Sequence, residues 1–126
     1  MRQRYNGGNW TFSRFNSFII STLRAGARRW QPKYETLNAA KTEKKINPKT
    51  GRLAQHFKCS KCNNEFTAKD MQVDHIIPAV DPSVGFTTWD EFIHRLFCEA
   101  ENLQALCVGC HKEKSSVERK IRNENK

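Results

Sequence analysis

The sequence predicts a small α+β protein, in which a basic, mostly helical arm (residues 1–55) precedes a zinc-stapled module (residues 56–126). Three observations lead to this prediction. Apolar residues recur at helical spacing early in the chain, two C-x-x-C pairs occur later, and short apolar runs beside the second pair are typical of strands. A chain of 126 residues has a limited core, to which a bound metal ion would add stability.

The positive charge is concentrated in the first half of the chain. Residues 1–58 hold 13 Lys or Arg against two acidic residues, whereas residues 59–126 have a net charge of −2. This asymmetry favours a polyanion, and nucleic acid in particular, as the partner of the arm. Solubility alone is the simpler alternative.

The arm is expected to contain two helices. Apolar residues recur at spacings of three and four over residues 12–30, and Pro32 can occupy the first turn of a second helix over about 32–42. Residues 44–52 contain Asn-Pro and Gly, which indicates a turn or mobile loop and would suit the tip of a hairpin. Four arginines lie mostly off the apolar stripe, as a solvated face or as phosphate contacts: Arg14, Arg24, Arg28 and Arg29.

Four of the five cysteines form the two C-x-x-C pairs, namely Cys59, Cys62, Cys107 and Cys110. In a reducing compartment two such pairs favour zinc over disulfides, and a redox motif would not require the second pair. Four thiolates form a closed structural site that performs no chemistry. Cys98 is then expected to be a buried apolar residue, while His56 could replace one cysteine but is more simply exposed.

The remaining elements follow from local patterns. Residues 71–77 are a strand candidate that Pro78 ends, and residues 103–106 are a second one. Thr88 and Glu91 form a capping-box pattern ahead of a helix over residues 88–97. Good helix formers fill residues 112–122, so that His111 is expected at a helix start.

A second, reactive site is predicted beside the cysteines. Asp74 is an oxygen ligand suited to Mg²⁺ or Mn²⁺, and His111 offers a nitrogen ligand that suits Mn²⁺, Ni²⁺ or Zn²⁺ better than Mg²⁺. His75 could act as a general base, and Asn102 could hold a loop or the imidazole by hydrogen bonds. The alternative is a surface dipeptide and a helix cap. Neighbouring strand residues face opposite sides, so Asp74 and His75 share a site only if the strand ends or twists there.

The order of these residues resembles a known family. Asp-His-Ile-x-Pro followed by Asn-Leu-x-x-Leu-Cys-x-x-Cys-His-x-x-Lys is similar to the HNH endonucleases, which have a ββα-metal fold. The likeness extends over about residues 56–116 to small HNH proteins of tailed phages, and residues 1–55 share only a looser likeness to a basic helical arm. Asp74 stands where the commonest pattern has His, which favours Mg²⁺ or Mn²⁺.

The resemblance implies a role for each residue. Asp74 and His111 would bind the catalytic ion, His75 would activate water, and Asn102 would position the loop that carries the base. Hydrolysis of double-stranded DNA would leave 5′-phosphate and 3′-hydroxyl ends. Lys112 and Lys114 would face phosphate or solvent equally well.

These features lead to an expected function and two rivals. One active site favours a monomer that nicks DNA, although a dimer could cut both strands. A role with phage packaging machinery is compatible with the resemblance. No run of about 18 apolar residues occurs, which favours a cytoplasmic protein without a membrane span.

The main rival is a zinc-dependent DNA-binding or packaging accessory protein that does not cut. A zinc-ribbon interaction module would explain neither the Asp-His pair nor the arm.

Overall fold

The computed structural model describes residues 3–125, and over that range the chain is a small α+β protein, as the sequence predicts. It has four α-helices and two small sheets. The first half contains α1 (Phe12–Ala27), α2 (Gln31–Ala39), β1 (Lys41–Ile46) and β2 (Leu53–Lys58). The second half contains β3 (Glu65–Thr67), β4 (Met71–His75), α3 (Trp89–Leu96), β5 (Leu103–Cys107) and α4 (Val108–Glu124).

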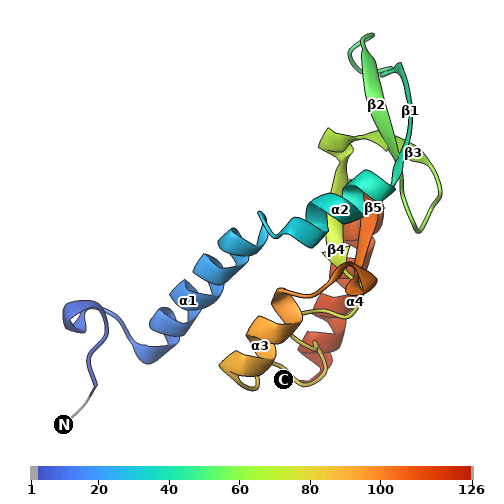
Figure 1. Cartoon of the computed structure of the whole chain (residues 1–126). Helices are drawn as coiled ribbons and strands as arrows, with labels where there is room; N and C mark the ends of the chain where they lie inside the picture. The colour runs from blue at the N-terminus through green and yellow to red at the C-terminus, as the bar shows by residue number, and fades with distance from the viewer. Residues whose placement is uncertain (1–2, 126) are drawn as a thin grey trace.

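The molecule is elongated because two elements project from its body. The N-terminal half of α1 extends to one side, and the β1–β2 hairpin extends at the opposite end (Figure 1). Between them lie the two-stranded sheet of β4 and β5, with α2 and α4 packed against it.

The predicted boundary between the arm and the module, at residue 55, falls inside β2. Within residues 3–125, none of the helices combines the length and the apolar character needed to cross a membrane.

The first helix is shorter than predicted. Thr11 caps α1 by accepting a hydrogen bond from the Arg14 amide at 3.2 Å, and the helix ends at Ala27 rather than near residue 30. Pro32 explains the early end, because its ring would clash with the carbonyl of residue 28 in a continuous helix. Trp30 is therefore extended, and α2 starts afresh at Gln31.

The second predicted helix, over residues 32–42, also ends early. Residues 41–46 form β1, which pairs antiparallel with β2, and β3 completes this sheet. The predicted hairpin tip is confirmed: the Asn47 amide donates to the Arg52 carbonyl at 2.8 Å, and Gly51 has a φ of 73°, which favours glycine. Residues 44–46, however, belong to the strand, because pairing across the sheet outweighs their weak local strand signal.

The module's other predicted elements are present, with shifted ends. Thr88 accepts a hydrogen bond from the Glu91 amide at 3.2 Å and caps α3. β4 ends at His75 rather than at residue 77. α4 begins at Val108 rather than at residue 112, because the Cys107 sulfur accepts a hydrogen bond from the Cys110 amide and caps the helix. His111 therefore lies about one turn inside the helix.

Two small cores hold the chain together. The first surrounds the sulfur atoms and consists of Phe57, Cys59, Met71, Ala105, Leu106, Cys107 and Cys110. The second joins the arm to the module, through Ala27 of α1, Ala79, and Phe92 and Leu96 of α3. Burial of a side chain such as Phe92 contributes about 1.5–3 kcal/mol to folding. The Trp30 indole also donates to the Cys98 carbonyl at 2.6 Å, so the C-terminal end of α1 is fixed against the module.

Candidate active site and metal centre

The four cysteines of the two C-x-x-C pairs meet in space. Their sulfur atoms all lie within 4.8 Å of one another, and Cys62 and Cys107 are 3.9 Å apart. A tetrahedral zinc ion with Zn–S distances of about 2.3 Å requires sulfur atoms about 3.8 Å apart. The cluster therefore has the donors and spacing of a structural zinc site.

Two backbone turns bring the sulfur atoms together. The first pair lies in a tight turn, in which the Asn63 amide donates to the Cys59 carbonyl at 3.0 Å. Asn63 has a φ of 62°, which asparagine tolerates better than most residues. The second pair lies at the N-terminus of α4, and the Ser60 amide connects the two parts by donating to the Ala105 carbonyl at 2.9 Å.

The electrostatics of the cluster suit a bound cation. Burial raises the pKa of the Cys59 thiol, but the backbone amides of Cys62, Cys107 and Lys61 outweigh burial and lower that pKa to about 6. Interaction with the Cys107 sulfur, and then burial, raise the pKa of Cys110 to about 12. Amides thus stabilise one thiolate, whereas four thiolates this close require a positive ion among them.

Cys98 and His56 lie outside this cluster, and Cys98 is half-buried. His56 is only 4% exposed, so the expectation of an exposed side chain is wrong. Its Nδ1 donates to the Ala54 carbonyl oxygen at 2.9 Å, which satisfies the ring within β2. The residue lies in the central strand of its sheet, because β2 pairs with both β1 and β3.

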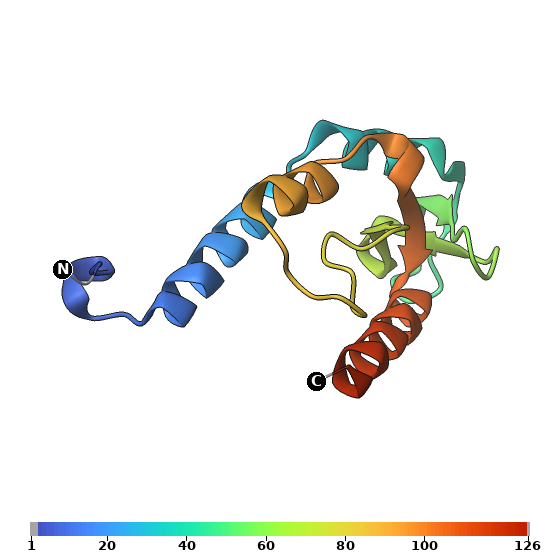
Figure 2. The ribbon, with the colours of Figure 1, turned by 90° about the horizontal axis from the view of Figure 1, so that it is seen from below.

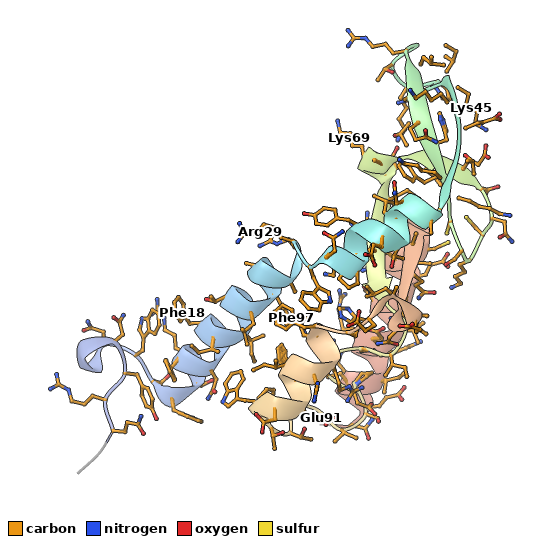
Figure 3. The ribbon with its side chains drawn as sticks, in the orientation of Figure 1. Phe18, Arg29, Lys45, Lys69, Glu91 and Phe97 are labelled. Atoms are coloured by element: carbon orange, nitrogen blue, oxygen red, sulfur yellow. The ribbon has the colours of Figure 1, made fainter. Side chains whose placement is uncertain are left out.

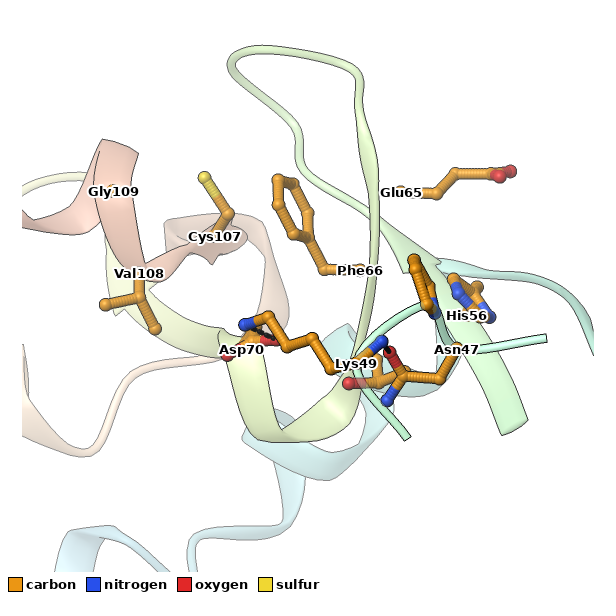
Figure 4. Close-up of a pocket in the computed structure, with 11 residues that line it drawn as sticks. Asn47, Lys49, His56, Glu65, Phe66, Asp70, Cys107, Val108 and Gly109 are labelled. Atoms are coloured by element: carbon orange, nitrogen blue, oxygen red, sulfur yellow. Dashed lines mark hydrogen bonds and ion pairs between the residues drawn. The ribbon is translucent and has the colours of Figure 1, made fainter. Parts of the chain in front are cut away.

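His56 borders a hollow of about 490 Å³ between the hairpin and the start of α4 (Figure 4). The acidic groups on its border already have cationic partners. Asp70 pairs with Lys49 at 3.0 Å, and Glu65 pairs with Lys45. With its charges paired, the hollow offers no evident metal or anion site.

The residues of the second predicted site also come together. Asp74 Oδ1 lies 3.7 Å from Nε2 of His111, which projects from α4 toward β4. Asp74 Oδ2 lies 2.9 Å from the Lys114 ammonium, yet it has no aligned hydrogen bond although it is buried. The ammonium group is thus the ionic partner of this buried oxygen, and a carboxylate beside an imidazole is a donor set that a metal ion can also use. Asp74 and His111 thus provide an oxygen and a nitrogen donor, which fits an ion that takes its other ligands from water or substrate.

The orientation of His75 is set from the distant α3 helix. Its Nε2 lies 2.8 Å from the carbonyl oxygen of Leu96, and since a carbonyl only accepts, Nε2 carries the proton. In the neutral ring Nδ1 then has a free lone pair. Burial, the largest influence, lowers the pKa of His75, while the Leu96 hydrogen bond opposes it only in part. The lowered pKa favours the neutral imidazole, which is the form that a general base requires.

Asn102 holds the loop that follows His75. Its side-chain oxygen accepts from the Ile77 amide at 2.9 Å, and its side-chain nitrogen donates to the Ile77 carbonyl at 3.1 Å. The Asn102 carbonyl also accepts from the Ile76 amide at 2.8 Å. The chain thus leaves the strand directly after His75, and this departure lets two adjacent residues share one site.

Asp74 and His75 border the same cavity, of about 520 Å³. It opens beside residues 76–88, which lie between α3 and α4 (Figure 2). Helix α1, the loop and α4 contribute the remaining border residues: Ile20, Arg24, Pro78, Ala79, Val80, Phe86, Lys114, Glu118 and Arg122. A cavity with carboxylate, imidazole and guanidinium groups is suited to binding an anion beside a cation.

The structure separates the predicted basic residues. Arg24 borders the cavity and lies over the Phe92 ring at 5.6 Å. Arg29 points away from the body on the side of α1 opposite to α3, and it is exposed like its neighbour Arg28 (Figure 3). Arg14 lies over Trp10 at 5.0 Å, near the far end of α1.

On α4, Lys112 is exposed, whereas Lys114 lies at the site. Sequence reasoning missed two residues of this helix, Glu118 and Arg122. They follow Lys114 at intervals of four, so they share its helix face, and this spacing was the available signal.

The fold and both clusters define a small α+β protein with a four-cysteine candidate metal centre and a second cavity bordered by Asp74 and His75. Comparisons with protein-family models, with curated proteins and with solved structures give no match to this chain.

Proposed function

We propose that this protein is a metal-dependent DNA endonuclease of the HNH type. One observation carries the proposal. One cavity is bordered by His75, whose Nδ1 is unprotonated, by Arg24 and by Asp74, and Asp74 forms a donor pair with His111 beside that cavity. A base, a metal-ligand pair and an anion-binding group are the components that phosphodiester hydrolysis needs.

The residues take the following roles. His75 accepts a proton from water at Nδ1, and the water oxygen attacks the phosphorus atom. The bond from phosphorus to the 3′ oxygen then breaks, and that oxygen gains a proton from solvent, which leaves 5′-phosphate and 3′-hydroxyl ends. A divalent ion held by Asp74 and His111, Mg²⁺ or Mn²⁺ in the first instance, would supply Lewis-acid charge to the phosphate and the leaving oxygen. Asn102 keeps the loop after the base in place.

The charge distribution supports DNA as the substrate. Residues 1–58 carry 13 of the 22 Lys and Arg residues, and α1 extends from the cavity with Arg14 and Arg24, followed directly by Arg28 and Arg29. Such an extended basic element binds phosphate backbones without reading sequence. The presence of one such cavity in the described chain favours nicking by a monomer. The resemblance to phage HNH proteins would place this activity in a host cytoplasm, beside DNA packaging.

The second candidate is a zinc-dependent protein that binds DNA, as in packaging, without cutting it. The four-cysteine cluster and the basic arm favour it as much as they favour the nuclease. A purely binding protein does not require the His75 ring to keep an unprotonated Nδ1 at a cavity beside the Asp74–His111 pair. The two candidates therefore differ in what happens when these side chains are replaced.

A supercoiled-plasmid assay with Mg²⁺ or Mn²⁺ tests the proposal. Wild type should convert the plasmid to its nicked form, and His75→Ala should be slower by a factor of about 10²–10⁴, the usual contribution of a general base. His94→Ala is the matched control, since His94 is an exposed histidine of α3. Each variant is first checked for one zinc ion and a cooperative melt.

The outcomes separate the candidates. Equal nicking by wild type and a folded His75→Ala protein would show that His75 is not the base. Binding of DNA by both proteins, with cutting by neither in any metal, would favour the accessory protein.

A further inference from the structure

The Lys114 side chain lies against Asp74, the carboxylate that would bind the metal ion under the proposed function. Its Nζ is 2.9 Å from Asp74 Oδ2, 2.9 Å from the His75 carbonyl oxygen and 2.5 Å from Glu118 Oε1. Three oxygen atoms thus surround one ammonium group, and they come from β4 and α4.

The surroundings make these charges interact strongly. The side chains of Lys114, Asp74 and Glu118 are 22%, 16% and 24% exposed, so solvent screens their charges only in part. An ammonium group and a divalent ion repel one another, so both cannot stay beside one carboxylate without cost. When Asp74 binds another cation, Glu118 can still pair with the Lys114 ammonium, because Glu118 follows at i+4 on the same helix face.

We propose that Lys114 is the resident counter-cation of the metal-free site, which a divalent ion must displace from Asp74 and which Glu118 then retains. This proposal rests on the proposed function, since it concerns the regulation of the same site. It makes metal affinity depend on two residues of α4 that are not themselves ligands. The arrangement keeps Asp74 neutralised when no divalent ion is bound, so the site is stable before it is loaded.

The test measures binding of Mn²⁺ alone to the zinc-loaded full chain, by electron paramagnetic resonance, without DNA or turnover. Lys114→Met should bind Mn²⁺ at least about tenfold more tightly, because the competing charge is gone. Glu118→Gln should bind it about threefold or more weakly, because the ammonium then keeps Asp74 as its only carboxylate partner. Lys112→Met and Glu113→Gln are matched controls of equal charge change at exposed positions of α4, and they should stay within about twofold of wild type.

A melting experiment adds a second measurement. Without its ammonium, Lys114→Met should melt below wild type, and Mn²⁺ should raise its melting temperature more than that of wild type, because tighter binding stabilises the folded state more. Lys114→Gln keeps an N–H donor for the His75 carbonyl and replaces the Met variant if that one fails to fold. If neither folds, the direction of the Glu118→Gln effect decides.

The outcomes are distinct. Unchanged or weaker Mn²⁺ binding by a folded Lys114→Met protein would overturn the counter-cation role. Changes of equal size in Lys112→Met would overturn it too, since they would reflect net charge alone. If wild type and Asp74→Asn bind Mn²⁺ equally, the metal does not use Asp74, and the proposed function loses its metal site as well.

Discussion

Asn102 binds both polar groups of one residue, Ile77: its side chain accepts from the Ile77 amide at 2.9 Å and donates to the Ile77 carbonyl at 3.1 Å. This pair of bonds connects the start of β5 to the exit of β4, two residues beyond His75. The position of the proposed base thus depends on an asparagine 27 positions later in the chain.

Asn102→Ala is expected to impair nicking more than folding. Loss of two partly exposed hydrogen bonds should cost about 1 kcal/mol of stability. The turnover rate should fall about tenfold or more, because the loop and the imidazole lose their fixed position. Single-turnover kinetics and a denaturation curve check this. Asn16→Ala, which removes an exposed bond to the Phe12 carbonyl in α1, should change neither. A rate loss no larger than the change in folded fraction would contradict the positioning role.

The four-cysteine cluster is expected to hold one zinc ion on which folding depends. Cys59→Ser should lose the zinc and the cooperative melt, because the first core is built around the sulfur atoms and metal binding contributes directly to folding. A strong chelator should have the same effect on wild type. Elemental analysis and circular dichroism measure both. Cys98→Ser should keep its zinc, and retention of zinc by Cys59→Ser would refute the assignment.

His111 is expected to set the preference for the catalytic metal. A nitrogen ligand favours Mn²⁺ over Mg²⁺, so replacing it with an oxygen ligand in His111→Asn should lower the ratio of Mn²⁺- to Mg²⁺-supported nicking about threefold or more. The ratio of rates is measured in the two metals at matched protein concentrations. His94→Asn should keep the wild-type ratio. An unchanged ratio in His111→Asn would mean that His111 does not contact the ion.

Replacement of Arg24 and replacement of Arg29 are expected to affect different steps, namely cleavage and DNA binding. Arg24 borders the cavity, so Arg24→Ala should lower the cleavage rate of bound DNA as well as affinity. Arg29 points away from the body, so Arg29→Ala should affect affinity at most, with a salt-dependence slope smaller by about 1 if it contacts a phosphate. Salt titrations and single-turnover rates separate these effects. Equal cleavage rates for the two variants at saturating protein would place Arg24 outside the reaction.

Local spacing was enough to predict several elements. The Thr88 cap and the apolar face of α3 can be read from about ten residues, because helix start signals act within one turn. The two C-x-x-C pairs likewise predict that the four sulfur atoms lie together, since a C-x-x-C turn can direct both of its sulfur atoms to one ion. Local spacing does not predict three of the helix ends correctly. A proline ring determines the end of α1, strand pairing determines the end of α2, and a cysteine cap determines the start of α4.

The chain's composition and motif order were thus sufficient to predict a basic arm, a sulfur cluster and a set of candidate site residues, since these depend on residue type and short spacings. Contacts between distant segments determined how those residues are arranged. The Leu96 carbonyl selects the proton position on His75, tertiary packing buries His56, and the packing of α4 brings Lys114 and Glu118 to Asp74. The contacts of His75 and Lys114 join residues more than 20 positions apart, and no periodicity in the sequence encodes them.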